Sequence, residues 1–207
     1  MSIRSKKDLE MALSSLKDFE NPSWELEQYA TPADIAADWV WQAALRGDIR
    51  NRIILDAACG PGVLGIAALL MGAKMVFFLD KDQEAIQLCQ QNYEKLKEEY
   101  EIGEAEFTLT DITLFDEEVN VVLQNPPFGT KEKHMDKPFL EKAFSISKVV
   151  WSMHKSVTKN FVEAITKDFK FRITDVFNYD FPIKAAFKFH QKPVKKVEVS
   201  LWRMEKN

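Results

Sequence analysis

The chain has 207 residues, of which 46% are hydrophobic and 29% are charged, and its formal net charge is −4. This length suits one domain with a proper hydrophobic core, and the composition excludes a disordered chain. The apolar runs are much shorter than the roughly 20 residues that a membrane-spanning helix needs. The negative net charge argues against nonspecific coating of nucleic acid, so any RNA binding must use a local basic surface.

The amino terminus and the cysteines indicate the compartment. Residues 1–7 lack the apolar stretch of a secretion signal, and Cys59 and Cys89 are too few for a disulfide framework or a cysteine zinc site. We therefore expect a cytoplasmic protein with no membrane contact. The three histidines are widely spaced, so no metal site is predicted, and a structural or RNA-facing role is favoured for His154.

Two amphipathic helices are expected before the first strand. Ser5 and Asp8 form a capping box, and the apolar residues that follow fall on one helical face. For the second helix, Thr31 offers an N-cap side chain and Pro32 suits the first helical position. Gly47 offers the stop signal for this helix.

A strand, a glycine turn and a helix follow in residues 51–65. Asp56 lies at the end of the strand, where it can accept hydrogen bonds from a ligand's ammonium group or from nearby backbone. Gly60 and Gly62 let the backbone approach a ligand closely. A glycine turn of this kind is by itself a weak signal, so its neighbours in the sheet decide its interpretation.

Acidic residues follow the next two predicted strands. The strand over residues 74–79 ends at Asp80, where a carboxylate would accept both hydroxyls of a ribose. A polar helix over 82–100 leads to a third strand around 105–109, and Asp111 lies just beyond it. Asp111 can accept the amino group of an adenine, or it can cap a turn or a short helix, and the sequence leaves both interpretations open.

The fourth strand is a continuous apolar run over residues 119–123, typical of a central parallel strand, and it leads into Asn125, Pro126, Pro127 and Phe128. Neither proline has an N–H, so the Pro126 carbonyl and the Asn125 amide oxygen can converge on one amino group. Two accepted hydrogen bonds favour a pyramidal nitrogen that can attack an electrophilic methyl group without a general base. Phe128 can stack on a planar base. A proline turn that merely closes the strand is the alternative.

Together, the glycine turn, the acid after the second strand and the Asn-Pro-Pro-Phe motif resemble the class I S-adenosylmethionine-dependent methyltransferases. Residues 26–32, 125–131 and 187–192 more narrowly resemble the methyltransferase-like protein 5 family. This resemblance implies S-adenosylmethionine as the cofactor and N6-adenosine methylation of small-subunit ribosomal RNA. One departure is Ala58, where these proteins commonly have glycine.

The resemblance also implies roles for two further segments. Gln28, Tyr29 and Thr31 would help to form the cofactor or substrate cleft, although a capped turn would explain the same residues. A small zinc-binding activator subunit would pair along the sheet edge that contains Phe107 and Leu109, since an unpaired edge strand can accept another strand.

Two basic segments are candidates for RNA contact. Residues 130–137 form a polar loop with Lys131 and Lys133, which could close over substrate or remain a plain exposed loop. The segment 183–197 is rich in lysine and contains no acid. If it is extended, one face carries the basic residues Lys184, Lys188, His190 and Lys192. The alternative is a solvated hairpin face over a phenylalanine core.

The remaining elements complete an α/β pattern. Expected are helices over 139–146 and 158–169, and strands over 149–153, 171–177 and 197–201. These predict one Rossmann-like domain over residues 1–207: a seven-stranded, mostly parallel sheet with helices on both faces. Residues 1–47 would form an amino-terminal helical addition, and residues 48–207 the catalytic core.

The expected reaction is direct methyl transfer to the N6 of adenosine in structured RNA. Rival substrates for the same acceptors are the 2-amino group of guanine in RNA and a glutamine side chain in a protein. Phe128 does not separate these rivals, although enzymes of the glutamine class generally carry tyrosine there. The basic carboxyl-terminal segment favours RNA. A scaffold that binds RNA or senses the cofactor without catalysis is the non-enzymatic alternative.

Overall fold

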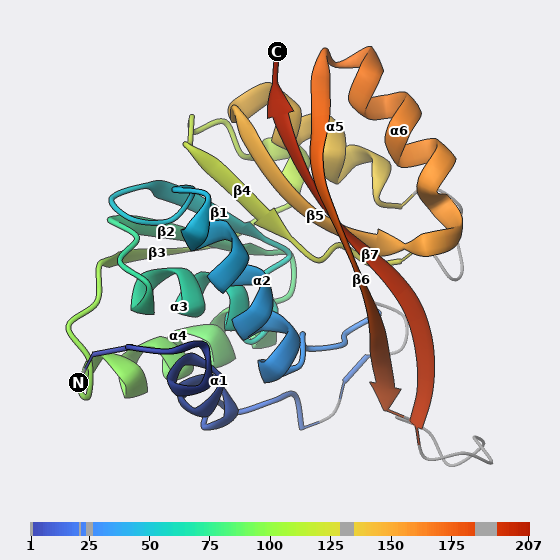
Figure 1. Cartoon of the computed structure of the whole chain (residues 1–207). Coiled ribbons are helices and arrows are strands. Elements are labelled where there is room, and N and C mark those ends of the chain that lie inside the picture. Colours follow the sequence, from blue (N-terminus) through green and yellow to red (C-terminus); the bar gives the residue numbers. More distant parts are fainter. Residues whose placement is uncertain (1, 21, 24–26, 129–134, 185–193) are drawn as a thin grey trace.

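The computed structural model describes residues 2–20, 22–23, 27–128, 135–184 and 194–207 (Figure 1). Its centre is a seven-stranded sheet with the order β3-β2-β1-β4-β5-β7-β6. The strands are β1 (Ile53–Ala57), β2 (Met75–Asp80), β3 (Glu104–Leu109), β4 (Val121–Gln124), β5 (Val149–Lys155), β6 (Phe171–Lys184) and β7 (Val194–Lys206). Only β7 runs against its neighbours β5 and β6 in this sheet, which confirms the predicted, mostly parallel α/β fold.

Helices cover both faces of the sheet. They are α1 (Lys6–Ser14), α2 (Ala33–Leu45), α3 (Val63–Leu70), α4 (Gln83–Lys97), α5 (Lys137–Ile146) and α6 (Lys159–Asp168), with short 3-10 turns η1 (Ile112–Leu114) and η2 (Ser156–Thr158). The first four helices pack on one face with one buried apolar cluster, and α5 and α6 pack on the other face with a second cluster (Figure 1). Both faces of the central strands are therefore buried, as their apolar runs predict.

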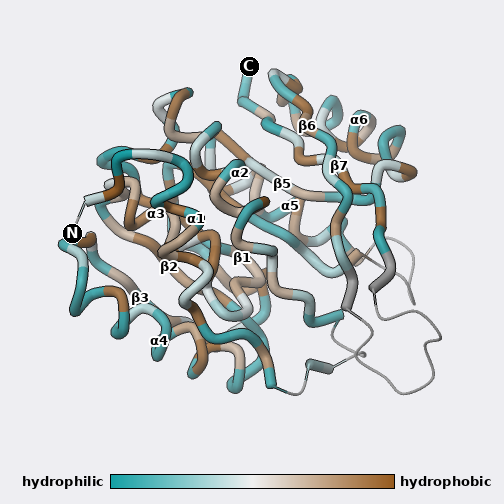
Figure 2. Tube along the Cα trace, turned by 60° about the horizontal axis from the view of Figure 1, so that its bottom comes forward, coloured by the Kyte–Doolittle hydropathy of each residue, from teal (hydrophilic) through white to brown (hydrophobic). Residues whose placement is uncertain are grey.

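The surface helix α4 shows how polar and apolar residues sort between core and solvent. Its buried residues include Ala85, Ile86, Cys89 and Leu96, and hydrophobic and hydrophilic segments alternate along it in Figure 2. This spacing of three and four residues is that of an amphipathic helix. Within the described ranges, no helix has the length and apolar character required to cross a membrane.

The two amino-terminal helices begin differently. Ser5 caps α1 as predicted, because its hydroxyl accepts the backbone N–H of Asp8 at 3.1 Å. The prediction that Thr31 caps α2 is wrong: Pro32 occupies the N-cap position, and no side chain in the described part of the chain caps this helix. The Thr31 hydroxyl instead accepts a hydrogen bond from the side chain of Asn125.

The β6–β7 hairpin extends well beyond the strands expected from the sequence. Its inner face carries Asp175 and Tyr179, which interrupt the apolar alternation. Both are satisfied by α2: Arg46 pairs with Asp175, and the Tyr179 hydroxyl donates to Asp38 at 2.7 Å. The strand continues past its apolar run because these tertiary partners satisfy its inward polar groups.

An irregularity in β6 decides which core its side chains join. The register against β7 shifts between Ile173 and Asp175, so that one extra residue lies in β6. Phe171 therefore packs with the α5 and α6 cluster, whereas Phe177 and Phe181 pack with the cluster of the amino-terminal helices. One inserted residue moves every later side chain to the opposite face.

Candidate active site

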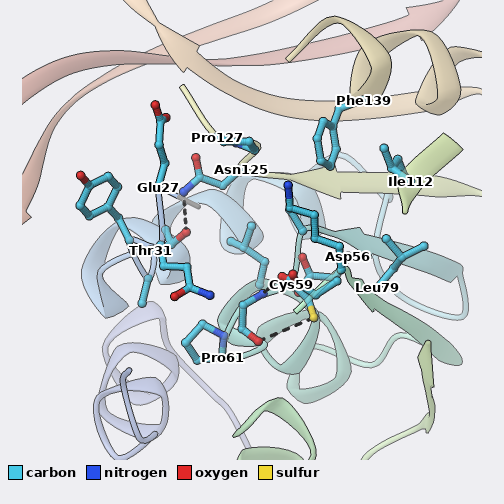
Figure 3. Close-up of a pocket in the computed structure, with 18 of the residues that line it drawn as sticks. Glu27, Thr31, Asp56, Cys59, Pro61, Leu79, Ile112, Asn125, Pro127 and Phe139 are labelled. Carbon is cyan, nitrogen blue, oxygen red and sulfur yellow. Dashed lines mark hydrogen bonds between the residues drawn. The ribbon is translucent and has the colours of Figure 1, made fainter. Parts of the chain in front are cut away.

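A cavity of about 440 Å³ opens at the carboxyl ends of the central parallel strands (Figure 3). It lies where β1 has β2 on one side and β4 on the other, the crevice in which open α/β sheets bind ligands. In Figure 3, Asn125, Pro127 and Phe139 stand along one side of the cavity, with Pro61 and Cys59 along the other. This arrangement places the Asn-Pro-Pro motif opposite the glycine turn.

The glycine turn depends on left-handed backbone at three positions. Ala58, Gly60 and Gly62 have φ angles of 57°, 51° and 84°. At Gly62 a Cβ would also lie 2.4 Å from the Cys89 sulfur, so only glycine fits there. Ala58 adopts its conformation at a steric cost that glycine would avoid. The departure from the family pattern is therefore a strained residue in an otherwise intact turn.

Asp56 holds the glycine turn to the start of α3. Its side chain is 1% exposed, and Oδ2 accepts the Gly65 N–H at 2.7 Å. Burial raises the pKa of Asp56 to about 7; the Gly65 hydrogen bond opposes this shift, and the charge of Asp80 adds to it. Gly65 lets α3 approach the sheet, since a Cβ there would lie 2.3 Å from the Phe78 ring.

Asp80 ends β2 beside the glycine turn. Its carboxylate accepts the backbone N–H of Gly60 at 2.9 Å and that of Asp82 at 3.0 Å. Burial raises the pKa of Asp80, while both backbone hydrogen bonds lower it. A carboxylate has about four lone-pair sites, so these bonds leave acceptor capacity for the hydroxyls of a ligand in the cavity.

Asp111 lines the cavity and also caps a short helix. It is the N-cap of η1, and its Oδ1 accepts the Thr113 N–H at 2.9 Å and the Thr113 hydroxyl at 2.6 Å. These bonds, led by that of the hydroxyl, lower the pKa of the Asp111 carboxyl. The capping interpretation therefore holds, and the carboxylate is ionised at neutral pH beside the cavity.

The segment before α2 forms a third wall of the cavity. Gln28, Tyr29 and Thr31 all line it, together with the buried Glu27. Gln28 donates to the Asp82 carboxylate, which ties this segment to the end of β2. Burial raises the pKa of Tyr29, and the charge of Glu27 adds to the shift. The structure thus brings together the three residues that the resemblance placed in the cleft.

Asn125 is fixed in one amide orientation. Its Nδ2 donates to the Thr31 hydroxyl at 3.1 Å, as the dashed line in Figure 3 marks. Its Oδ1 is buried and has no hydrogen-bond partner within the described part of the chain. A buried acceptor of this kind is costly unless a ligand satisfies it. Pro127 lines the cavity beside it, and Pro126 is buried.

Phe128 contacts the β6–β7 hairpin. Its ring is half-buried, and it packs edge to face on Phe181 with the centroids 5.7 Å apart and an interplanar angle of 88°. The described cavity lining contains Asn125 and Pro127 but not Phe128. In this structure the ring therefore joins the motif to the hairpin, and its role in stacking on a base stays a prediction.

The basic residues expected to contact RNA are mostly beyond the described ranges. Lys184 is the last residue of β6, and Lys196 of β7 pairs with Asp180 at 3.6 Å. The hairpin face thus includes an acid from the opposite strand. Those outside the described residues are Lys131, Lys133, Lys188, His190, Lys192 and the side chain of Lys184.

Several residues that form or support the cavity were not predicted from the sequence, because no motif or spacing marks them. Phe19 follows α1, and its ring lies 3.4 Å from where a Cβ on Gly60 would be. Asn92 of α4 holds this segment in place, because its amide exchanges hydrogen bonds with the backbone of Lys17 and donates to the Pro61 carbonyl. Neither contact is local, so spacing along the chain could not reveal them. Phe139, near the start of α5, is a further lining residue of this kind.

The residues around the cavity fit a nucleoside-containing sulfonium cofactor. The glycine turn brings the backbone of Gly60 to the cavity wall, and Asp56 and Asp80 provide acceptors for hydroxyl and ammonium groups. Gly62, which was also expected to contact the cofactor, lies against Cys89 and is not among the described lining residues. Described residues contain no group of three or more His, Cys, Asp and Glu side chains arranged to hold a metal ion. With the sheet order, these features define a class I S-adenosylmethionine-dependent methyltransferase.

The chain belongs to the family described as Conserved hypothetical protein 95, which it matches over residues 38–170. Mettl5 of Drosophila melanogaster, an rRNA N(6)-adenosine-methyltransferase, is 32% identical over 95% of this chain and 94% of that protein. The uncharacterized protein MJ0284 of Methanocaldococcus jannaschii is 36% identical over 97% of this chain and 94% of that protein. PH1948 of Pyrococcus horikoshii, described as a candidate RNA methyltransferase, is 38% identical with a TM-score of 0.89, covering 99% and 98% of the two chains.

Proposed function

We propose that the protein transfers a methyl group from S-adenosylmethionine to the N6 of an adenosine in structured RNA, with small-subunit ribosomal RNA as the substrate. The observation that carries this proposal is the buried Oδ1 of Asn125, an acceptor without a partner in the described structure. Mettl5 of Drosophila melanogaster supports the substrate, because it is an rRNA N(6)-adenosine-methyltransferase and matches nearly the whole chain.

The target amino group would be held by Asn125 Oδ1 and the Pro126 carbonyl. The adenine 6-amino nitrogen is a poor nucleophile, because its lone pair is delocalised into the ring. Hydrogen bonds accepted from both of its N–H groups favour a pyramidal nitrogen and make the lone pair available. Thr31 contributes by accepting from Asn125 Nδ2, which keeps Oδ1 as the free acceptor.

The cofactor would be held mainly by the glycine turn and the acids at the strand ends. When bound, S-adenosylmethionine supplies an electrophilic methyl group on sulfur. Gly60 and Gly62 would accommodate its methionine portion, Asp80 its ribose hydroxyls and Asp111 its adenine amino group. Alignment of the amino group with the methyl would supply much of the rate, because this displacement requires an in-line approach.

The RNA would approach along the β6–β7 hairpin and the segment after the Asn-Pro-Pro-Phe motif. β6 runs parallel to β5, so its carboxyl end lies at the edge of the sheet where the cavity opens. Lysines of these segments would contact phosphates, and Phe128 would face a base that is unstacked into the cavity. Since the net charge of the chain is −4, such contacts must be local and salt-sensitive.

An activator subunit would bind at the β3 edge of the sheet. β3 is the terminal strand beside β2, and Leu109 at its end is 51% exposed. An edge strand with an exposed apolar residue can accept a strand from another protein. Full activity of the isolated chain, with no gain when a small zinc-binding subunit is added, would show that such a partner is dispensable.

The test is transfer of labelled methyl from S-adenosylmethionine to unmodified small-subunit ribosomal RNA, followed by nucleoside digestion and mass spectrometry. N6-methyladenosine is the expected product. Labelled N2-methylguanosine would instead identify guanine in RNA as the substrate, and label on protein would identify a protein side chain. Failure to bind S-adenosylmethionine in calorimetry would instead support a scaffold without catalysis.

A further inference from the structure

Four buried polar side chains form a chain between β4, β5 and the start of α5. Gln124 and Ser152 are fully buried, His154 is 1% exposed and Asp136 is 9% exposed. Gln124 and Ser152 are neighbours in the parallel pairing of β4 with β5, and His154 is two residues further along β5. All three side chains therefore share the face that α5 covers.

Burial of so many polar groups in this layer requires an explanation. One step back along the same face, the neighbouring strand residues are Val122 and Val150, which pack with the apolar side of α5. Polar atoms in such a place destabilise the fold unless they are hydrogen-bonded. Apolar side chains would fill this layer at lower cost, so packing alone does not explain Gln124, Ser152 and His154 at the carboxyl ends of these strands.

The hydrogen bonds define a direction for the chain. Gln124 Nε2 donates to Ser152 Oγ at 3.0 Å, Ser152 Oγ lies 2.6 Å from His154 Nε2, and His154 Nδ1 lies 2.8 Å from Asp136 Oδ2. Since an ionised Asp136 can only accept, Nδ1 carries the proton. Nε2 of the neutral ring then accepts from the Ser152 hydroxyl. These three hydrogen bonds are compatible with this tautomer of His154, while the Oε1 of Gln124 is buried without a partner among the described residues.

Asp136 is used unusually for a residue in its position. It is the N-cap of α5, where an aspartate side chain ordinarily accepts an N–H from the first turn of its own helix. Here no described side chain caps the helix, and the carboxylate is directed to His154. The start of α5 is thus held by β5 and not by its own cap.

The polar chain connects two walls of the active-site cavity. Gln124 directly precedes Asn125, which carries the free acceptor. At the other end, Asp136 is flanked by cavity-lining residues of the α5 start: Met135, Pro138 and Phe139. The position of each wall relative to the other is therefore coupled to one imidazole ring.

We propose that His154 is a positioning residue for methyl transfer, which through Asp136 and Ser152 sets the distance between the α5 wall and the Asn125 acceptor. His154 contacts neither substrate nor cofactor in this role. The inference rests on the proposed function for the reaction that is assayed, but the hydrogen-bond chain and its tautomer can be measured without that reaction.

The main experiment compares two substitutions of Asp136 in the full-length protein. Asp136→Ala removes the acceptor for Nδ1–H, and a displacement of about 1 Å between the walls would lower kcat by up to about a hundredfold. Asp136→Asn keeps an acceptor oxygen, so it should recover most of the lost kcat. The matched control is Ser147→Ala: Ser147 is buried at the opposite end of α5, where its hydroxyl donates to the Ala143 carbonyl.

The control separates positioning from stability. Thermal unfolding midpoints are measured for all variants, and kcat is measured well below the lowest midpoint. Ser147→Ala should lower the midpoint and leave kcat within about twofold of wild type. If Asp136→Ala retains wild-type kcat, or if Ser147→Ala loses as much kcat at an equal loss of stability, the proposal is overturned.

A spectroscopic experiment keeps the inference testable apart from the substrate. Nitrogen-15 NMR of labelled histidine, with His154→Gln used for assignment, should show a neutral ring protonated at Nδ1 at neutral pH. Asp136→Ala should abolish the preference for this tautomer. A neutral ring protonated at Nε2 in the wild type would refute the hydrogen-bond chain from Gln124 to Asp136. Absence of methyl transfer to RNA by the wild type, with the tautomer intact, would refute only the proposed function.

Discussion

The two sides of the cavity are built in different ways. The side proposed for the cofactor, called the cofactor side, is built mainly from one continuous strand, turn and helix start, in which Asp56 binds Gly65 only nine positions away; Asp80 joins it from the next strand. The side proposed for the target amine, called the amine side, is assembled from distant segments, because Asn125 is oriented by Thr31, which is 94 positions away. Removal of a group on the cofactor side should therefore affect cofactor affinity, whereas removal of one on the amine side should affect turnover.

The largest effect is expected for Asn125→Ala. This change removes the buried acceptor that we propose for the target amine, so kcat should fall by about 10²–10³-fold, the usual loss for one preorganised polar group at a reacting centre. The dissociation constant of S-adenosylmethionine, measured by calorimetry, should change by less than about threefold. Asn120→Ala is the control: Asn120 precedes the opposite end of β4 and accepts the Ile53 N–H. Unchanged turnover in Asn125→Ala would reject the mechanism.

Asp80→Ala should show the converse pattern. Hydrogen bonds to a charged group contribute about 1.5–3 kcal/mol, so the cofactor dissociation constant should rise by about ten- to hundredfold. At saturating cofactor, kcat should stay within a fewfold of wild type. The variant also loses two backbone contacts of Asp80, so its folded state is checked by circular dichroism. A loss confined to kcat would contradict the division between the two sides.

Thr31→Val tests whether the amino-terminal segment acts on the amine or on the cofactor. Valine has a similar shape but cannot accept from Asn125, so the amide loses its orientation and kcat should fall by about tenfold. Thr31→Ser keeps the hydroxyl and should retain most activity. If Thr31→Val instead weakens only cofactor binding, Thr31 belongs to the cofactor side.

A smaller effect is expected from pH through Asp56. Its folded pKa of about 7 lies above the ordinary value of 3.8, so the protonated carboxyl favours folding at low pH. That contribution to stability is lost as the pH rises through about 7. A cationic ligand nearby favours the ionised form.

Binding of the cofactor should therefore depend on pH. S-adenosylmethionine should bind about three- to tenfold more tightly at pH 8 than at pH 6. S-adenosylhomocysteine, which lacks the sulfonium charge, should show a weaker dependence in the same calorimetric titration. Asp56→Asn should flatten the difference between the two ligands. Equal pH profiles for both ligands in the wild type would exclude Asp56 as the source.

The smallest effect concerns the turn itself. Ala58 has a φ of 57°, and replacing it with glycine relieves about 1–2 kcal/mol of strain while adding flexibility to the unfolded chain. Ala58→Gly should therefore raise the free energy of unfolding by up to about 1 kcal/mol, measured by urea denaturation. Ala57→Gly, in the buried strand next to it, should destabilise the protein. Destabilisation by Ala58→Gly would show that the turn is not strained.

Much of the fold was predictable because its signals are local. Apolar runs identified the parallel strands, and Ser5 capped its helix as expected. The predicted strand over 171–177 was too short because its extension to Lys184 depends on pairing with β7 and on tertiary partners, such as Asp38 of α2 for the Tyr179 hydroxyl. Thr31 was assigned to the wrong partner for a similar reason, since a helix cap and a long-range hydrogen bond require the same hydroxyl.

The sequence by itself determined which residues follow which strand: a glycine turn after β1, an acid after β2 and the Asn-Pro-Pro-Phe motif after β4. Parallel strands bring such ends to one edge, so these residues meet without further information. Only the tertiary structure decided that Asn125 Oδ1 has no partner among the described residues, that Phe128 packs on Phe181, and that His154 links β5 to the start of α5. Each of these depends on contacts between residues far apart in the chain, and periodicity along one segment carries no information about them.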